Sequence, residues 1–128
     1  MKTYKNLTIW DGCSDEMREG DLSVANGKFV LNRTNGRDFS GCFAIPGLID
    51  AHVHLCLDPE ISDPLKQSEA DAESIKQDIR DRALTMVKAG ITSARDLGGG
   101  QWLELQIRDE IARGQTLGPR LVCAGQPI

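Results

Sequence analysis

From residue 46 onward, short apolar runs alternate with longer amphipathic segments, and this alternation is the feature that most constrains the fold. The apolar runs cover residues 48–55, 91–97 and 120–125, and the amphipathic segments between them cover residues 68–88 and 101–113. The runs have the length and composition of buried strands. Parallel strands need a crossover connection of about a dozen residues or more, usually a helix. The order strand, helix, strand, helix, strand therefore predicts an α/β unit with a parallel sheet.

The two predicted helices carry apolar residues at steps of mostly three and four positions, as expected for one face packed on a sheet. These stripes are Ile75, Ile79, Ala83, Met86 and Val87 in the first helix and Leu103, Ile107 and Ile111 in the second. Gly90 and Gly114 follow the stripes and are typical helix stop residues. We expect both stripes to face the core.

The first 45 residues differ in kind, because their apolar runs are short and separated by turn signals. Asn26-Gly27 lies between two β-prone runs, which is a strong hairpin signal since both residues tolerate a positive φ. Asn35-Gly36 predicts a second turn. We expect a small antiparallel sheet that is too short to be stable alone, and a division into domains 1–45 and 46–128.

Composition excludes several classes of partner. The chain has 15 basic and 19 acidic residues and a net charge of −4, so a nucleic-acid partner is not expected. No apolar run approaches the ~20 residues of a membrane span, so no membrane partner is expected either. The four cysteines are widely spaced and form no Cys-x-x-Cys pair. We expect a cytoplasmic protein without a disulfide framework.

Both histidines of the chain lie two residues apart, at His52 and His54. Residues at i and i+2 of a strand project to one face, so two imidazoles would converge there as half of a zinc-type site. Asp50 has the same parity and could orient a ring from the second coordination sphere. A histidine pair without a metal on a sheet face is the alternative.

Other features carry weaker predictions. Gly98-Gly99-Gly100 could bind an anion before a helix, but a turn is the favoured interpretation, because the run lacks the spacing of a nucleotide-binding loop. Arg95 and Asp96 end the second strand and could contact a substrate or form a structural network. Cys56 could add a soft metal ligand, although a buried structural thiol is favoured.

The segment Ile45–Leu55, which reads Ile-Pro-Gly-Leu-Ile-Asp-Ala-His-Val-His-Leu, closely resembles the first barrel strand of the amidohydrolase superfamily, Pro-Gly-Leu-Ile-Asp-x-His-x-His. Residues 89–99 resemble the second strand of that family, and residues 118–121 resemble the start of the third. The Arg-Asp-Leu-Gly-Gly form of the second strand is most similar to the imidazolonepropionase and Xaa-Pro dipeptidase-like branch.

This resemblance implies a truncated (β/α)₈ TIM barrel, of which the chain holds about the first three strands, preceded by part of a small β-sandwich subdomain. A complete barrel needs about 250 residues. The resemblance also implies that His52 and His54 bind a divalent metal, Zn²⁺ by preference, with one or two ions in the full-length parent. The remaining ligands of the family are a carboxylate or carboxylated lysine, two further histidines and a late aspartate. The chain contains no third histidine.

The parent would then hydrolyse carbon–nitrogen bonds in an amide, peptide or cyclic amide with a metal-bound hydroxide, and deamination of a ring stays open. Its substrate would be a small molecule or a dipeptide-like compound. This chain alone is expected to be inactive, to hold metal weakly or not at all, and to form a homo-oligomer, with domain swapping as one route. The alternative is a small non-catalytic α/β assembly module.

Overall fold

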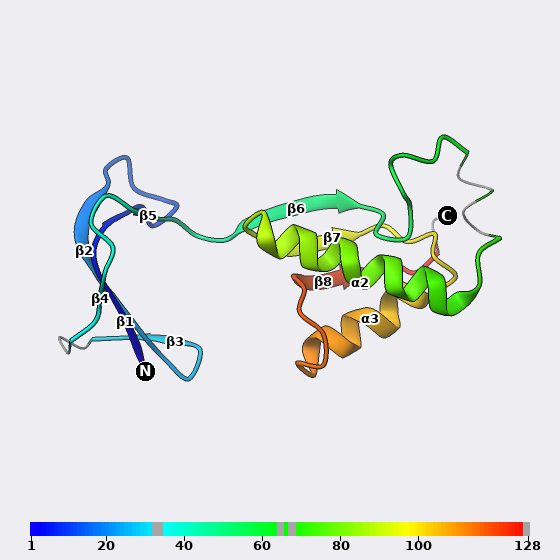
Figure 1. The fold of residues 1–128 in the computed structure, drawn as a ribbon. Coiled ribbons are helices and arrows are strands. Elements are labelled where there is room, and N and C mark those ends of the chain that lie inside the picture. Colours follow the sequence, from blue (N-terminus) through cyan, green and yellow to red (C-terminus); the bar gives the residue numbers. More distant parts are fainter. Residues whose placement is uncertain (32–34, 64–65, 67–68, 127–128) are drawn as a thin grey trace. The chain divides into compact units, whose positions relative to one another are not determined.

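The computed structural model describes residues 1–31, 35–63, 66 and 69–126. The chain forms two compact units, Met1–Pro46 and Gly47–Ile128 (Figure 1). No helix within the described ranges is long and apolar enough to cross a membrane.

The first unit is a five-stranded sheet in the order β3-β2-β1-β4, with β5 also paired to β1. Its strands are β1 (Lys2–Ile9), β2 (Arg18–Ala25), β3 (Lys28–Val30), β4 (Arg37–Asp38) and β5 (Phe43–Ala44). The predicted hairpin is confirmed: β2 and β3 pair antiparallel, and Asn26 and Gly27 have φ values of 51° and 71°. The prediction of a purely antiparallel sheet is wrong, because β4 and β5 run parallel to β1. Since β2 covers one edge of β1, the returning chain pairs with the other edge.

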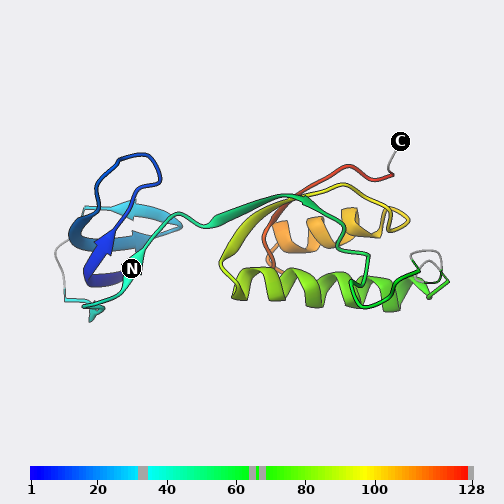
Figure 2. The same ribbon diagram turned by 90° about the horizontal axis from the view of Figure 1, so that it is seen from above.

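The second unit is a three-stranded sheet in the order β6-β7-β8 with parallel pairings throughout. Its strands are β6 (Leu48–Val53), β7 (Ile91–Asp96) and β8 (Arg120–Cys123), and its helices are α2 (Ala72–Lys88) and α3 (Leu103–Ala112). Figure 2 shows both helices on the same side of the sheet. The predicted alternation of strands and helices is therefore confirmed.

The first strand ends earlier than predicted. We expected it to run to Leu55, whereas β6 ends at Val53. The backbone N–H of Leu55 donates to the side chain of Asp96 at 3.1 Å. That amide therefore has a side-chain acceptor instead of a backbone partner in the sheet, and the regular strand stops.

Both helices begin later than predicted. The expected start of the first helix at Ser68 lies outside the described residues. Helix α2 begins at Ala72. The Asp71 side chain caps it by accepting hydrogen bonds from the backbone amides of Glu73 and Ser74. Helix α3 begins at Leu103 because Gln101 and Trp102 have left-handed φ values of 56° and 60° and so cannot continue a helix backward.

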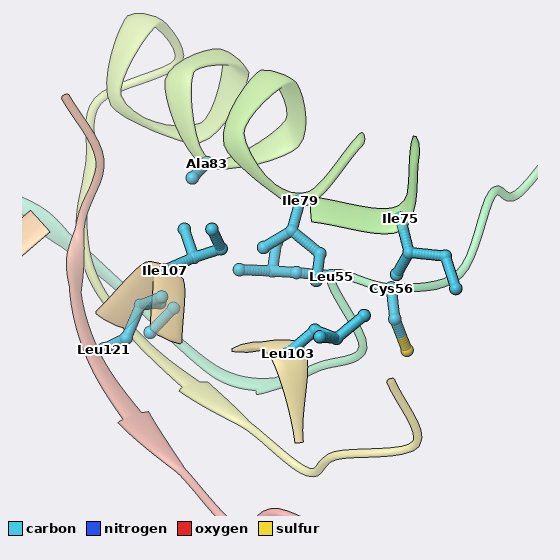
Figure 3. Packing of buried hydrophobic residues seen from close by; sticks show 9 residues of the cluster. Leu55, Cys56, Ile75, Ile79, Ala83, Leu103, Ile107 and Leu121 are labelled. Atoms are coloured by element: carbon cyan, nitrogen blue, oxygen red, sulfur yellow. The ribbon is translucent and has the colours of Figure 1, made fainter. Parts of the chain in front are cut away.

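The core of the second unit lies between the helix pair and the sheet (Figure 3). Ile79 of α2 and Ile107 of α3 are both 0% exposed. The buried cluster comprises Leu55, Cys56, Ile75, Ile79, Ala83, Ala94, Leu103, Ile107 and Leu121. Each predicted stripe thus contributes to one core, as its spacing requires.

Glu104 on the first turn of α3 is a charged residue buried beside this core, with 1% of its surface exposed. Neither carboxyl oxygen has a hydrogen-bond partner among the described residues. Burial raises the pKa of the Glu104 carboxyl, and the negative charge of Asp96 adds to the rise. An unsatisfied buried polar group costs about 1–3 kcal/mol, so Glu104 is a source of instability.

Replacement of this carboxyl should stabilise the chain. We expect Glu104→Leu to increase the free energy of unfolding at neutral pH by about 1–3 kcal/mol, measured by urea denaturation. Because the folded-state pKa is raised, wild-type stability should fall as the pH rises above the unfolded-state value of 4.5. The variant should lack that part of the pH dependence.

Glu110 on the same helix provides the matched control. It forms a bidentate pair with Arg80 at 2.8 and 2.9 Å, and this hydrogen bonding lowers the pKa of the Glu110 carboxyl. Glu110→Gln should therefore decrease stability at neutral pH. An equal loss of stability in Glu104→Leu and Glu110→Gln would contradict the assignment of Glu104 as an unsatisfied charge.

Candidate metal centre

The two histidines lie at the carboxyl end of β6, where His52 belongs to the strand and His54 follows it. Their ring centroids are 5.4 Å apart with an interplanar angle of 64°. Val53 between them packs against the helix-covered core. Neighbouring strand residues face opposite ways, so both rings lie on the sheet face that the helices leave open. His52 is exposed and His54 is half-buried.

His54 has a specific partner for one ring nitrogen. Its Nδ1 lies 2.7 Å from the carbonyl oxygen of Gly98. A carbonyl can only accept, so Nδ1 carries the proton in this contact and Nε2 keeps its lone pair. A backbone carbonyl that holds one nitrogen and leaves the other free is the usual setting of a metal-binding histidine.

Gly98 can hold this carbonyl in place because the residue is a glycine. Its φ is +85°, and a Cβ at this position would collide with the backbone of Gly125. The glycine run forms a loop after β7, with a bend at Gly100 that leads into a turn at Gln101 and Trp102; the turn favoured from the sequence thus lies at the end of the run. Sequence reasoning did not identify Gly98 as the partner of His54. One signal in the sequence could have identified this partner. The glycine run directly follows residues 91–97, and this strand is expected to lie beside the strand that carries the histidines.

Asp50 contacts the backbone. Its Oδ1 accepts from the backbone N–H of His52 at 3.1 Å. A contact between this carboxylate and an imidazole ring does not occur among the hydrogen bonds of the described residues. Asp50 thus acts on the strand that carries His52, and its predicted role in orienting a ring stays a prediction.

Arg95 and Asp96 lie on opposite faces of β7. Arg95 is exposed, and its Nε donates to the backbone carbonyl of Ala51 on β6 at 2.7 Å. Asp96 is 1% exposed on the helix side. The suggested substrate contact is therefore wrong for Asp96, because its side chain lies in the interior. The suggested Arg–Asp network is absent from the described part of the chain, since neighbouring strand residues diverge.

Cys56 belongs to the core. The residue is 9% exposed, and burial raises the pKa of its thiol to about 11, with further contributions from the charges of Asp96 and Glu104. Cys56 packs in the buried cluster between the helices and the sheet, which agrees with the structural role favoured from the sequence.

The described residues contain no group of three or more His, Cys, Asp or Glu side chains that could hold a metal ion by themselves. The histidine pair nevertheless has the donor chemistry that borderline divalent metals prefer, with one ring already oriented by a carbonyl. It can supply two ligands of a site and leaves the others to further groups.

Comparison with known proteins identifies the family of this chain. The model of the amidohydrolase family matches residues 43–128. An adenine deaminase from Methanoregula boonei is 39% identical over 56 residues, and one from Desulfatibacillum aliphaticivorans is 42% identical over 55 residues. Each alignment covers 40% of this chain and 10% of the relative. The chain thus spans a small part of the curated relatives.

Solved structures share the fold at low identity. An Xaa-Pro dipeptidase with bound methionine superposes with a TM-score of 0.79 and 22% identity, over 99% of this chain and 34% of that one. A molinate hydrolase superposes with a TM-score of 0.77 and 18% identity, over 94% of this chain and 29% of that one. The match to the family model covers the whole of the second unit and includes both histidines. The chain belongs to the amidohydrolase family.

Proposed function

We propose that His52 and His54 are two metal ligands of a metal-dependent hydrolase that acts on carbon–nitrogen bonds. The observation that carries the proposal is the contact between His54 Nδ1 and the Gly98 carbonyl. This contact leaves the Nε2 atom of His54 available as a lone-pair donor. The centroids of the His52 and His54 rings are 5.4 Å apart. Both rings lie on the face that the helices leave open.

The residues present fit a divalent metal, with Zn²⁺ preferred for its affinity for imidazole. Such a metal supplies a Lewis acid and lowers the pKa of a water molecule so that it can attack at neutral pH. Within this chain, the Gly98 carbonyl orients His54, and Asp50 holds the backbone amide of His52. Two imidazoles make half of a four-coordinate zinc site, so the proposal requires further ligands and a general base from additional strands.

The substrate class follows from the chemistry that the relatives' names share. A deaminase and a dipeptidase both add water at a carbon that bears a nitrogen leaving group. We therefore include amides, peptides, cyclic amides and amino-substituted rings. Membership of the amidohydrolase family favours this function over a non-catalytic α/β assembly module.

The proposal extends to the architecture. The parallel β6-β7-β8 sheet would form the first part of a (β/α)₈ barrel, and the five-stranded unit would form part of a β-sandwich subdomain. The open sheet face would become the barrel interior. The high exposure of Ile49 and Val122, at 74% and 64%, supports this, since such side chains are expected to be covered.

We further propose a cytoplasmic location, no nucleic-acid or membrane partner, and a small-molecule or dipeptide-like substrate. All four cysteines are free thiols, which suits a reducing compartment. The net charge of −4 disfavours nucleic acid.

Metal binding tests the ligand assignment directly. We expect the 128-residue chain to bind Co²⁺ or Zn²⁺ weakly, and His52→Ala or His54→Ala to reduce the affinity by about tenfold or more, as measured by isothermal titration. Because Cys13 and Cys42 are exposed thiols, all titrations use a Cys13→Ser, Cys42→Ser background as the control for adventitious binding. Unchanged affinity in both histidine variants would refute the assignment.

Activity of the chain alone is the second test. We expect no metal-dependent hydrolysis of an Xaa-Pro dipeptide and no deamination of adenine, because copies of one chain contribute only the same two histidines. Product is followed by chromatography with added Zn²⁺. Turnover that disappears in His52→Ala would show that the chain is itself active.

Self-association is the third test. The open face carries exposed Ile49 and Val122, and an uncovered sheet edge can pair with another chain. We expect a concentration-dependent homo-oligomer by light scattering. Val122→Lys should shift the equilibrium towards monomer, whereas Leu117→Lys, on an exposed loop residue, should not. A stable wild-type monomer at high concentration would contradict this proposal.

A further inference from the structure

Asp96 at the end of β7 makes two hydrogen bonds that concern the candidate metal centre. Its Oδ2 accepts from the backbone N–H of Leu55 at 3.1 Å, and its Oδ1 accepts from the backbone N–H of Gly98 at 2.7 Å. Leu55 directly follows His54, and Gly98 supplies the carbonyl that binds His54 Nδ1. One buried carboxylate therefore holds both backbone segments that determine how the His54 ring lies.

We propose that Asp96 is a positioning residue that sets the tautomer and orientation of His54 through Gly98. The effect of Asp96 on metal affinity rests on the proposed function, whereas its effect on the His54 tautomer does not. Asp96 itself lies on the helix side of the sheet and touches neither ring. It acts on the residue that does.

The contacts form a closed circuit. From Asp96, one hydrogen bond leads to Leu55, the backbone leads to His54, the ring leads to Gly98, and a second hydrogen bond returns to Asp96. Displacement of the loop would break at least one member of this circuit. The Gly98 carbonyl is thereby kept where it can accept from Nδ1.

Two backbone hydrogen bonds hold the same loop from outside the circuit. The amide of Leu97 donates to the carbonyl of Val53 at 2.9 Å, and the amide of Gly99 donates to the carbonyl of Gly125 at 3.1 Å. Gly98 is thus flanked by residues that are tied to β6 and to the segment after β8. Its own amide is left for Asp96.

An aspartate suits this position because a carboxylate has two oxygens that both accept. Asparagine has nearly the same shape, but one of its two terminal groups is a donor and cannot accept from an amide. Asp96→Asn therefore leaves one of the two amides, that of Leu55 or of Gly98, without its acceptor. Either loss opens the circuit that holds His54.

The alternative is that Asp96 merely satisfies two buried amides, as many structural carboxylates do. Both roles predict a loss of stability in Asp96→Asn. Only the positioning role predicts a changed His54 tautomer in a variant that remains folded. The tautomer is therefore the decisive measurement.

The first experiment uses the metal-free, ¹⁵N-labelled chain and long-range ¹H–¹⁵N spectra of the imidazoles at about pH 8, which lies above the ordinary titration range of an imidazole side chain. We expect wild-type His54 to be the Nδ1–H tautomer, and Asp96→Asn to show a mixture with the Nε2–H tautomer. If Asp96→Asn does not fold, the His54 tautomer is measured in Asp96→Ser instead, because serine keeps one acceptor. Wild-type His54 in the Nε2–H form would overturn the inference without any variant.

Glu104→Gln is the matched control, because Glu104 is an equally buried acid of the same unit and bonds to neither amide. It should keep the wild-type His54 tautomer even though stability changes. Amide spectra and thermal melts establish that each variant is folded. A tautomer change of equal size in Glu104→Gln would mean a general loosening and would overturn the inference.

The second experiment titrates Co²⁺ into the same variants. We expect Asp96→Asn to weaken binding by about tenfold and Glu104→Gln to leave it unchanged. If His52→Ala leaves the Co²⁺ affinity of the wild type unchanged while the tautomer shifts in Asp96→Asn, the metal proposal fails and the positioning role stands. If wild type binds metal while tautomer and affinity are unchanged in folded Asp96→Asn, the positioning role fails and the metal proposal stands.

Discussion

The packing of α2 and α3 against a single face of the β6-β7-β8 sheet is the constraint on which the rest of the second unit depends. Ile79 and Ile107 are fully buried where the two helices meet the sheet. Since strand side chains alternate between faces, one covered face defines one open face. His52 and Arg95 project to the open face because Val53 and Asp96 project to the covered one.

The end of β6 shows how this packing positions the two histidines of the candidate site. The strand stops at Val53 because the next free amide, that of Leu55, is taken by a carboxylate from the interior. His54 therefore lies just beyond the regular ladder, where a loop carbonyl can reach its ring. A strand that continued to Leu55 would have its amides committed to the ladder, and the Asp96 contact would be lost.

The same interior holds two acids with opposite consequences. Asp96 uses both oxygens as hydrogen-bond acceptors, whereas Glu104 uses neither within the described residues. Their proximity raises the pKa of the Glu104 carboxyl beyond the effect of burial alone. The unit thus combines a satisfied acid that organises the loops with an unsatisfied acid that lowers stability, and burial by itself distinguishes neither role.

The related proteins have names that indicate different substrates, namely a deaminase, a dipeptidase and a molinate hydrolase. The dipeptidase and the molinate hydrolase share with this chain its arrangement of strands and helices. Substrate choice in such folds resides in the loops beyond the carboxyl ends of the strands. Family membership therefore predicts the class of chemistry better than it predicts the substrate.

The sequence by itself determined the alternation of strands and helices, the Asn26-Gly27 hairpin and the pairing of His52 with His54 on one face. Those features depend on periodicity and turn chemistry, which are local. Only the tertiary structure decided that β4 and β5 run parallel to β1, that Asp96 lies inside, and that the Gly98 carbonyl binds His54. These outcomes join residues that are far apart in the chain. The hydrogen bond between His54 and Gly98 spans 44 positions. It has no local signal in the sequence, because its geometry exists only once the strands are packed.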